Sequence, residues 1–558
     1  MKANAIKVEN FLEGKKQFVV PLFQRTYSWE EKDIEKLWKD LVATKEDPEY
    51  VHFFGSFVTM PIPTGPGIPN EYIVIDGQQR LTTIFTLLAA LRNQMIHINS
   101  NYPNKDEIDE DYLINKFRPE FRYKLIPTQA DRTILYTIID EIDPLIDSEH
   151  MLFKVYTFFR NKLSKLNTID EIIEYKDALL ARFSVVDIYL EDGDDPYLIF
   201  ESLNGTGEPL TQADLVRNYL FMRLDQNDQD SMEKYYKKFW YPMQQNLQDN
   251  LEYFIRHFLS INGVLPNFNK IYTIFKEKYD AEAENEDDII ELMEELHRYA
   301  GYYVKFLNPE KENDGNLRSY FEKFKRLEVT TPYPLLLALY NDYAKENGAK
   351  GKINADSFLN CLKSIETFVL RRAVCRIPVN ALNQYLPTVY GSLDHEDLAE
   401  SIKDTFKNAK GSRRIPDYEE FKKCLIEGTI PKKTVRYVLE EIEKKYCDNK
   451  ELVDLKTLQI AHIMPQTLTE EWKTQLGESW ELVHKKYLEN IGNLTLTGYN
   501  PTYSNKTFEE KRDMENGFID SGLRLNSYFK NLDKWNKEEI MERTNNLARI
   551  ALKIWSID

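Results

Sequence analysis

A short segment in the first hundred residues combines the residue types that bind phosphate. The segment DGQQR (76–80) places an acid, a glycine, two amides and an arginine between a predicted strand and a predicted helix. The helix N-terminus attracts an anion, the glycine lets the backbone come close, and Arg80 can bind phosphate oxygens with two hydrogen bonds. Asp76 can hold a magnesium ion or orient a water molecule. The alternative is a polar turn in which Asp76 and Gln79 only cap the helix.

A second segment adds aromatic rings to this chemistry. PLFQRTYSW (21–29) places Gln24 and Arg25 among aromatic residues at the entrance of another predicted helix. An aromatic ring and a guanidinium can stack on a base and bind phosphate. Because the chain contains no GxxxxGK[ST] motif, a nucleotide site here is not an ordinary P-loop.

The C-terminal part contains a histidine and asparagines in the order of a ββα finger. His462 ends one predicted strand, Asn493 opens a second, and Asn500 or Asn505 starts the following helix. In such a finger a neutral histidine deprotonates the water that attacks a phosphodiester, a divalent metal ion stabilises the charge, and an asparagine orients the imidazole. From the residues alone, a satisfied turn histidine beside a proline stays open as the alternative.

The elements that position these residues follow from apolar patterns. FFGSFVTM (53–60) and YIVID (72–76) predict two strands joined by a Pro/Gly-rich hairpin loop, and RLTTIFTLLAALRNQMI (80–96) predicts a buried helix. Capping boxes are predicted over 28–31 and 211–214. These elements place the DGQQR segment between a strand and a buried helix.

The chain is too long for one compact core, and its patterns change twice. Strand and helix signals mix over 1–230, the pattern is almost entirely helical over 231–405, and mixed signals return over 406–558. The predicted fold class is therefore α+β, multidomain and mostly helical, with three domains.

Charge and composition limit the function classes. The chain has a formal net charge of −18, and its whole acidic excess lies in residues 1–360, because residues 361–558 contain 31 basic and 31 acidic side chains. This balance argues against non-specific coating of nucleic acid. Arg371 and Arg372, at the end of a predicted helix, are candidates for a local DNA contact, although arginines there can equally complement the helix C-terminus.

The sequence shows no signal for export or membrane insertion. No apolar stretch reaches the length of a membrane helix, no secretory signal pattern opens the chain, and the four cysteines form no CxxC pair. We therefore expect a cytoplasmic protein with no membrane segment.

The N-terminal motifs resemble a known family. PLFQRTYSW, FFGSFV, VIDGQQRLTT and IFESLNGTGEPLTQADLVRN, taken in this order, are similar to the N-terminal domain of GmrSD type IV restriction proteins. That domain resembles the ParB and sulfiredoxin folds, in which such a loop binds and hydrolyses nucleoside triphosphates. The resemblance implies catalytic roles for Asp76 and Arg80. It implies a nucleotide site made of Gln24, Arg25, Asp76, Gly77, Gln78, Gln79, Arg80 and Asn204.

The C-terminal motifs resemble the same family. HIMPQ, IGNLTLT and NxxxxNKxFxxK are similar to the HNH (His-Me finger) nuclease domain, a ββα-metal fold that closes GmrSD-like proteins. By this resemblance His462 is the general base and Asn493 orients it. Asn500, with Asn505 as the alternative, binds Mg²⁺ or another divalent metal ion, and Lys511 contacts phosphate.

One position departs from the family pattern. An acid that binds the metal usually precedes the histidine, whereas this chain has Ala461. Because a methyl group cannot coordinate magnesium, we predict weak or absent cleavage by this chain.

The leading hypothesis is an anti-phage, modification-dependent restriction endonuclease. Binding and hydrolysis of a nucleoside triphosphate would gate an HNH nuclease that cuts phage DNA with modified bases or backbone, because a nuclease with mainly phosphate contacts discriminates poorly by itself. The alternative is a nucleotide-dependent DNA-binding or regulatory protein with a non-catalytic HNH domain, which Ala461 supports. A purely structural interaction protein would leave DGQQR unexplained. Assembly into a homo-oligomer stays open.

Overall fold

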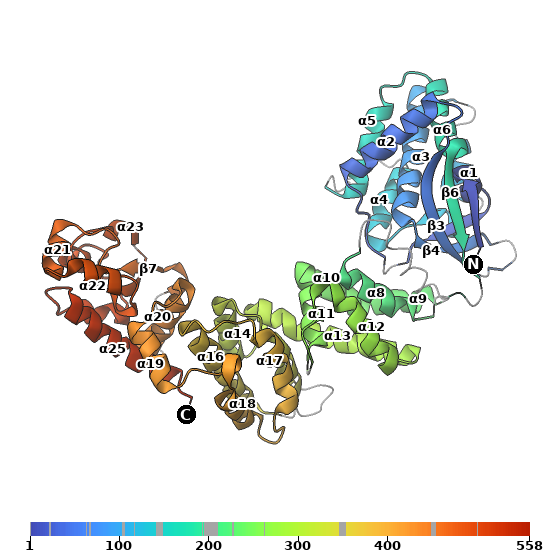
Figure 1. Cartoon of the computed structure of the whole chain (residues 1–558). Helices are drawn as coiled ribbons and strands as arrows, with labels where there is room; N and C mark the ends of the chain where they lie inside the picture. Colours follow the sequence, from blue (N-terminus) through green and yellow to red (C-terminus); the bar gives the residue numbers. More distant parts are fainter. Residues whose placement is uncertain are drawn as a thin grey trace. The chain divides into compact units, whose positions relative to one another are not determined.

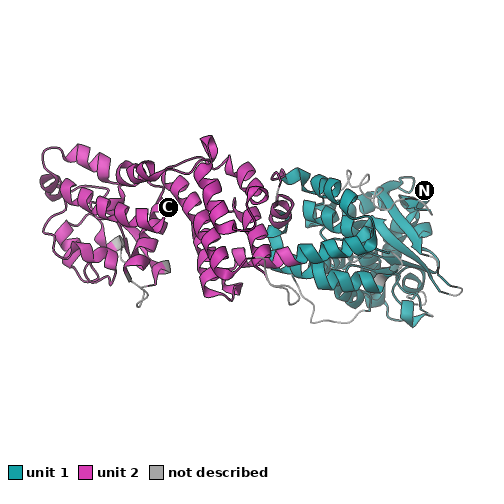
Figure 2. Cartoon of the chain, turned by 90° about the horizontal axis from the view of Figure 1, so that it is seen from below, with its two compact units in different colours: residues 1–252, 268–297 teal, residues 253–267, 298–558 magenta. Residues whose placement is uncertain are grey.

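The structure, a computed structural model, divides into two compact units (Figures 1 and 2). Unit 1 comprises Met1–Glu252 and Phe268–His297, and unit 2 comprises Tyr253–Asn267 and Arg298–Asp558, so the helical segment predicted over 231–405 is divided between them. No described helix is both long enough and apolar enough to cross a membrane. The residues described are 2–21, 24–62, 64–65, 68–102, 106–116, 118–140, 149–191, 194, 210–225, 228–261, 263–344, 353–447, 454–498 and 500–557.

A six-stranded mixed sheet forms one layer of unit 1, with the strand order β1-β6-β3-β4-β2-β5. The strands are β1 (Lys2–Lys7), β2 (Lys16–Val19), β3 (His52–Ile62), β4 (Asn70–Asp76), β5 (Leu125–Ile126) and β6 (Phe183–Tyr189). β3 and β4 are antiparallel, as the predicted hairpin requires, whereas β4 runs parallel to β2 and β3 runs parallel to β6. The end of β4, where DGQQR begins, therefore lies at the centre of the sheet.

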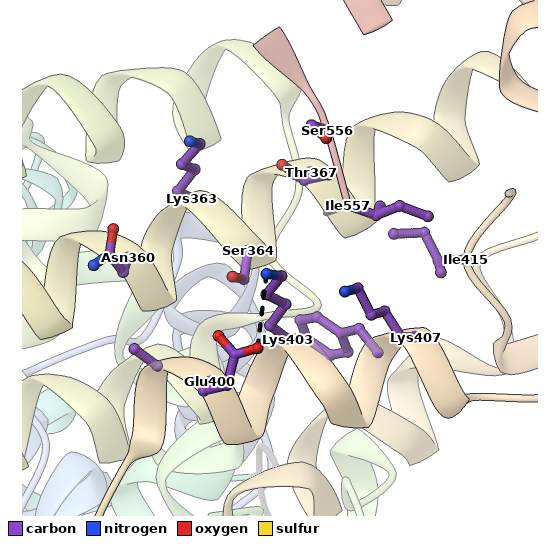
Figure 3. Close-up of a pocket in the computed structure, with 12 residues that line it drawn as sticks. Asn360, Lys363, Ser364, Thr367, Glu400, Lys403, Lys407, Ile415, Ser556 and Ile557 are labelled. Carbon is purple, nitrogen blue, oxygen red and sulfur yellow. Dashed lines mark ion pairs between the residues drawn. The ribbon is translucent and has the colours of Figure 1, made fainter. Parts of the chain in front are cut away.

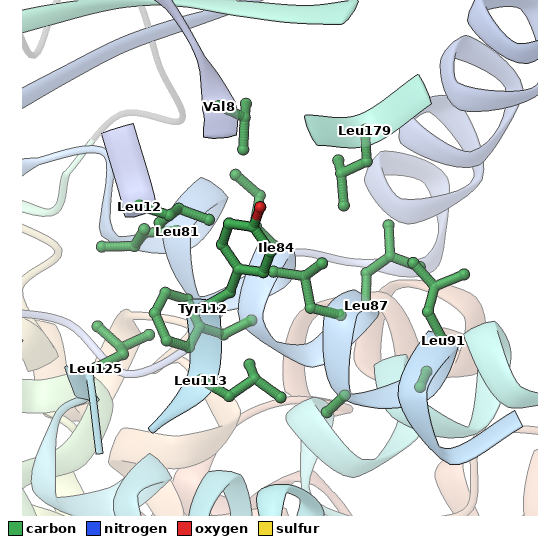
Figure 4. Close-up of a cluster of buried hydrophobic side chains, with 14 of the residues drawn as sticks. Val8, Leu12, Leu81, Ile84, Leu87, Leu91, Tyr112, Leu113, Leu125 and Leu179 are labelled. Atoms are coloured by element: carbon green, nitrogen blue, oxygen red, sulfur yellow. The ribbon is translucent and has the colours of Figure 1, made fainter. Parts of the chain in front are cut away.

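The buried helix α3 (Gln78–Ile98) begins where β4 ends. Its side chains are buried on nearly all sides, and α5 (Met151–Leu163) and α6 (Ile169–Arg182) pack along it. Figure 4 shows apolar side chains of α3 gathered with Val8 and Leu179 of neighbouring elements. Because this burial removes a large apolar surface from water, it holds the first turn of α3 in place.

The start of helix α2 differs from the prediction. The helix spans Glu31–Glu46, and its capping box uses Glu30 as N-cap with Asp33, so the capping box predicted over 28–31 is wrong by two residues. The backbone N–H of Ser28 instead donates to the side chain of Gln79 at 2.9 Å. Ser28, which local spacing predicted as the N-cap, therefore makes a tertiary hydrogen bond to Gln79 instead.

The second predicted capping box is confirmed. Helix α8 (Gln212–Met222) begins after Thr211, whose hydroxyl accepts a hydrogen bond from the N–H of Asp214 at 3.1 Å. The carboxylate of Asp214 accepts from the N–H of Thr211 in return, at 3.3 Å. Here the local signal decided the helix start.

Unit 2 is built mainly of helices that meet across buried ion pairs. They include α14 (Gly315–Leu327), α16 (Ala355–Val374), α18 (Leu398–Asn408), α19 (Tyr418–Glu427), α20 (Lys432–Cys447), α22 (Trp480–Tyr487), α24 (Phe508–Asp513) and α25 (Lys537–Ile554). Arg326 of α14 pairs with Glu440 and Glu441 of α20, both at 2.7 Å. Residues on both sides of the predicted boundary at 405–406 thus belong to one compact unit.

A small ββα element lies within unit 2. The strands β7 (Gln459–His462) and β8 (Leu494–Thr497) are antiparallel, with His462 opposite Leu494, and the short helix α23 (Asn500–Tyr503) follows. A core of aromatic and aliphatic side chains packs against it. The predicted order of strand, strand and helix is confirmed, and His462 ends the first strand as expected.

Candidate functional site

The DGQQR turn (residues 76–80) joins β4 to the first turn of α3. Gly77 is the N-cap of the helix and has a φ of +97°, a left-handed conformation that favours glycine. A Cβ atom there would lie 2.5 Å from the ring of Phe57 and 3.1 Å from the carbonyl oxygen of Ser56. Only glycine fits, so the turn brings the N-terminus of α3, with its unsatisfied N–H groups, close to the sheet.

The two charged side chains of the turn pair with each other. A terminal nitrogen of Arg80 donates to Asp76 at 3.0 Å and to the carbonyl oxygen of Ser56 at 2.7 Å, while the guanidinium lies 5.8 Å from the ring centre of Phe57. Both side chains keep a quarter or more of their surface exposed. The pair is therefore accessible to an anion that Arg80 could bind, with Asp76 beside it.

The glutamines around the turn face inward. Gln24 is buried and donates to the carbonyl oxygens of Val74 and Ile75 at 2.7 and 3.0 Å. Gln79 is buried too, and it accepts from the N–H of Ser28. Both amides bind backbone groups of the turn and of the segment that approaches it. In this arrangement Gln79 supports the turn and Gln24 holds β4, and the nucleotide contact of Gln79 stays a prediction.

Three further residues predicted to bind the nucleotide differ in where the structure places them. Gln78, in the first turn of α3, and Arg25 are both partly exposed, so they stay available to a ligand. Asn204 lies outside the described residues. The predicted site thus divides into a partly exposed set and a buried supporting set. The partly exposed set is Asp76, Gln78 and Arg80 with Arg25.

A pocket opens beside Arg80 and includes Trp29 of the segment PLFQRTYSW. Its volume is about 490 Å³, and we call it the aromatic pocket. It is lined by Trp29, Lys32, Asp33, Lys36, Leu37, Asp40, His52, Phe53, Phe54 and Arg80. Trp29 and Phe54 meet edge to face at 6.4 Å, and Phe53 is 62% exposed. Burial lowers the pKa of His52, with Asp40 3.7 Å away opposing this change. The sequence signals for this pocket were Trp29 and the aromatic run in β3.

His462 pairs with a carboxylate that no motif indicated. Its Nε2 lies 3.1 Å from an oxygen of Glu489, and the imidazole is mostly buried. Burial lowers the pKa of His462 below its usual value, Glu489 raises it, and the positive charges of Lys432 and Lys511 lower it further. The ring is therefore largely neutral at pH 7, which is the state that a general base requires.

Asn493 holds the backbone beyond the histidine. Its fully buried amide accepts from the N–H of Met464 at 2.8 Å and from the indole of Trp535 at 3.0 Å, and donates to the carbonyl oxygens of Met464 and Leu488. Among the described residues, the ring of His462 is hydrogen-bonded to Glu489 and not to Asn493. The predicted direct orientation of the imidazole by Asn493 is therefore wrong.

Lys511 also supports the strand end from below. The side chain is fully buried, and its ammonium donates to the carbonyl oxygens of His462 and Ile463 at 3.2 and 3.0 Å. Burial lowers the pKa of Lys511 to about 8. A buried ammonium held by two carbonyl groups cannot reach a phosphate, so the predicted DNA contact is wrong.

The described residues around His462 do not supply a full ligand set for a metal ion. Ala461 presents a buried methyl group to an apolar cluster that includes Tyr503 of α23. Asn500 begins α23, but its side chain is not among those described, and Asn505 lies exposed beyond that helix. No cluster of three or more His, Cys, Asp or Glu side chains that could hold a metal occurs in the described part of the chain. The donor set of a magnesium site is therefore incomplete.

Comparison with known proteins finds family matches for both the N-terminal and the C-terminal part of the chain. The family model "GmrSD restriction endonuclease, N-terminal domain" matches residues 8–221, and "GmrSD restriction endonucleases, C-terminal domain" matches residues 415–550. The chain belongs to the GmrSD family. It is also similar to an uncharacterized protein of Methanocaldococcus jannaschii, with 25% identity over 253 residues that cover 39% of this chain and 42% of that protein. The GmrSD match places DGQQR and His462 in different family domains.

The arginine pair proposed for DNA binding is buried in this GmrSD protein. Arg371 and Arg372 are each 1% exposed. Arg371 lies 4.7 Å from the ring centre of Phe421, and Arg372 donates to the carbonyl oxygens of Arg414 and Pro378 at 2.6 and 2.8 Å. Both side chains tie α16 to its neighbours, so the predicted DNA contact at these residues is wrong.

A pocket of about 280 Å³ in unit 2 does present lysines, and we call it the basic pocket (Figure 3). It is lined by Asn360, Lys363, Ser364, Thr367, Ala399, Glu400, Lys403, Phe406, Lys407, Ile415, Ser556 and Ile557. Glu400 is its one acid and lies 3.7 Å from Lys403. Three lysines against one glutamate give this pocket a net positive charge.

Proposed function

We propose that this GmrSD protein is a modification-dependent restriction endonuclease in which a nucleoside triphosphate, bound in unit 1, controls cleavage of DNA by unit 2. The observation that carries the proposal is the match of both GmrSD domains in order, each with one charged site at a strand end. Phage DNA with modified bases or backbone is the expected substrate.

The nucleotide would occupy the DGQQR turn and the aromatic pocket. Its phosphates would lie at the N-terminus of α3, where the exposed guanidinium of Arg80 would replace part of its contact with Asp76 by contacts with phosphate oxygens. Its base would stack on Trp29 or Phe53 in the pocket beside Arg80. Asp76 would then be free to orient the attacking water.

DNA would contact unit 2 through exposed lysines. Lys363, Lys403 and Lys407 of the basic pocket replace the buried arginines as the proposed phosphate contacts. The acidic excess in the first 360 residues would repel unmodified DNA from the rest of the chain, which keeps binding local.

Cleavage would use His462 as general base, and we propose that it is weak in the chain as it stands. When present, the family's divalent metal ion stabilises the charge that develops on the phosphate. The methyl group of Ala461 stands where its carboxylate ligand is expected, so no step here is assigned to a metal.

One experiment tests this function. Phage DNAs with and without base or backbone modification are incubated with the chain, magnesium and each nucleoside triphosphate, alongside the Ala461→Glu variant. We expect hydrolysis of at least one triphosphate and cleavage of a modified DNA, stronger in the variant. Absence of cleavage in both proteins would reject the nuclease function.

A second candidate function follows from the same position. If Ala461 marks a natural loss of the metal site, the protein would bind DNA in a nucleotide-dependent manner and regulate other proteins without cutting. This alternative predicts a nucleotide-dependent change in DNA affinity and no cleavage by Ala461→Glu. The same incubation therefore separates the two functions, with a DNA-binding assay added.

A further inference from the structure

We infer that Glu489 is a positioning residue that holds the imidazole of His462 as its Nε2–H tautomer and leaves Nδ1 free to accept a proton. This inference rests on the proposed nuclease function, although its structural part can be tested without cleavage.

The contact geometry supports this role. Nε2 of His462 is 3.1 Å from Oε1 of Glu489, and a carboxylate can only accept a hydrogen bond at neutral pH, so the ring must donate from Nε2. No described residue is hydrogen-bonded to Nδ1. In a neutral imidazole the other nitrogen then carries the lone pair.

Neighbouring side chains hold the backbone beside both partners of this pair. Lys511 and Asn493 fix the backbone at and after His462, as described above. Directly after Glu489, the amide of Asn490 donates to the carbonyl oxygen of Ile426 at 2.7 Å and accepts from the hydroxyl of Thr544 at 2.5 Å. The backbone that carries the ring and the carboxylate is therefore held in place, which favours the short contact between the two side chains.

The pair defines where the proton of the attacking water goes during phosphodiester hydrolysis. Nδ1 takes a proton from water as the water oxygen forms a bond to phosphorus, and the bond from phosphorus to the leaving oxygen breaks, with that oxygen taking a proton from solvent. The imidazolium that results lies against the carboxylate of Glu489, which opposes the positive charges of Lys432 and Lys511. Glu489 thus supplies the negative charge that Ala461 cannot, but at the histidine rather than at a metal.

The first test reads the tautomer directly. Nitrogen-15 NMR of the full chain with labelled histidine, assigned with His462→Gln, should show the Nε2–H tautomer in the unmodified chain and in the control Glu481→Ala, which removes an exposed acid of α22. Glu489→Ala should populate both tautomers. Glu489→Gln, which keeps an acceptor, should retain Nε2–H and make the ring titrate at lower pH. Thermal unfolding checks that each variant is folded.

The second test reads cleavage in the Ala461→Glu background. Glu489→Ala should lower the rate about 10- to 100-fold, and Glu489→Asp should recover part of it. An Nδ1–H tautomer, or a tautomer ratio that Glu489→Ala leaves unchanged, would overturn the inference. If the tautomer shifts as expected but no variant cleaves DNA, the nuclease function fails while the role of Glu489 as a positioning residue stands.

Discussion

The DGQQR turn of unit 1 and the His462 strand end of unit 2 use their polar residues in the same way but differ in what they leave for a ligand. In both, buried amides hold the backbone: Gln24 and Gln79 around the turn, Asn493 beyond the strand. The turn still presents an acid and an arginine at a helix N-terminus. The strand end presents a histidine and a carboxylate, with a methyl group at position 461.

The two sites therefore offer different polar groups to a ligand. The turn has an acid and a partly exposed arginine at a helix N-terminus, whereas the strand end has a histidine with a methyl group at the position of the expected acidic ligand. We therefore expect unit 1 to hydrolyse a nucleoside triphosphate and the cleavage activity of unit 2 to be limited by Ala461.

Removal of Arg80 should have the largest effect. Arg80→Ala deletes the exposed cation at the helix N-terminus, so triphosphate hydrolysis should fall about 100- to 1,000-fold. Phosphate release measures this rate. Arg25→Ala, which removes a partly exposed arginine nearby, should have a smaller effect. Equal loss in both variants would show that the turn is not the centre of the site.

A methyl group at Gly77 should disrupt the turn itself. Gly77→Ala combines the strain of φ +97° with a clash against Phe57, so we expect a loss of about 3 kcal/mol in the free energy of unfolding. Gly14→Ala is the matched control, because Gly14 has φ +91° but open space around it. Denaturant unfolding should show a clearly smaller loss for the control. Equal losses would assign the whole effect to backbone strain.

An acid at position 461 should strengthen metal binding and DNA cleavage by unit 2. Ala461→Glu buries a carboxylate in an apolar cluster, so it should lower the melting temperature without metal, and magnesium should recover it. Cleavage should rise about 10- to 100-fold. Ala461→Gln, which fits similarly but binds magnesium poorly, is the control. Recovery of both variants by magnesium would place the metal elsewhere.

Local patterns were enough to predict the elements that carry both sites. The hairpin, the buried helix after DGQQR, the capping box at Thr211 and the ββα order all depend on neighbouring residues, and the structure has them. Burial of long apolar runs and short-range turn chemistry dominate at these places.

The direction in which each polar side chain turns could not be predicted in this way. Ser28 was predicted to cap a helix, but its N–H donates to Gln79 instead. Lys511 was predicted to contact phosphate, but its ammonium donates to backbone carbonyl groups at the end of β7. Glu489 was missed because its partner lies 27 positions away and no motif joins them. Such choices depend on tertiary partners, which residue types and spacing do not reveal.

Buried and exposed cations of unit 2 should separate stability from DNA binding. Arg372→Gln removes a buried guanidinium that holds two carbonyl groups, so it should cost about 1–3 kcal/mol of unfolding free energy and leave the salt dependence of DNA binding unchanged. Lys407→Gln in the basic pocket should do the reverse, with the slope of log affinity against log salt reduced by about 1.

Filter binding over a range of salt concentrations, combined with denaturant unfolding, measures both quantities for these variants. A reduced salt slope for Arg372→Gln would return the DNA contact to the arginine pair. An unchanged slope for Lys407→Gln would remove the basic pocket from the DNA surface.

The smallest effect concerns two buried lysines, one in each unit. Lys511 donates to carbonyl groups beneath His462, and Lys124 of unit 1 donates to those of Gly14 and Asp111 at 2.9 and 2.5 Å. Burial lowers the pKa of each lysine from 10.5 to about 8. Between pH 8 and 9.5 each of these lysines therefore binds more protons in the unfolded chain than in the folded chain, so each contributes stability that increases with pH. The thiols of Cys361 and Cys375, whose pKa values burial raises, oppose this contribution, so it is read as the difference between the unmodified chain and each lysine variant.

Tyrosines that ionise in the unfolded chain near pH 10 limit this window from above, because burial raises the pKa of many of them in the folded protein. Replacing either lysine by methionine should remove about 1–2 kcal/mol of the gain between pH 8 and 9.5, as measured by denaturant unfolding at several pH values. If burial shifts the pKa of both lysines equally, Lys511→Met and Lys124→Met should reduce the change of unfolding free energy with pH by similar amounts. A change in only one variant would show that the ammonium of the other lysine stays charged in the fold because its two carbonyl groups offset the cost of burial.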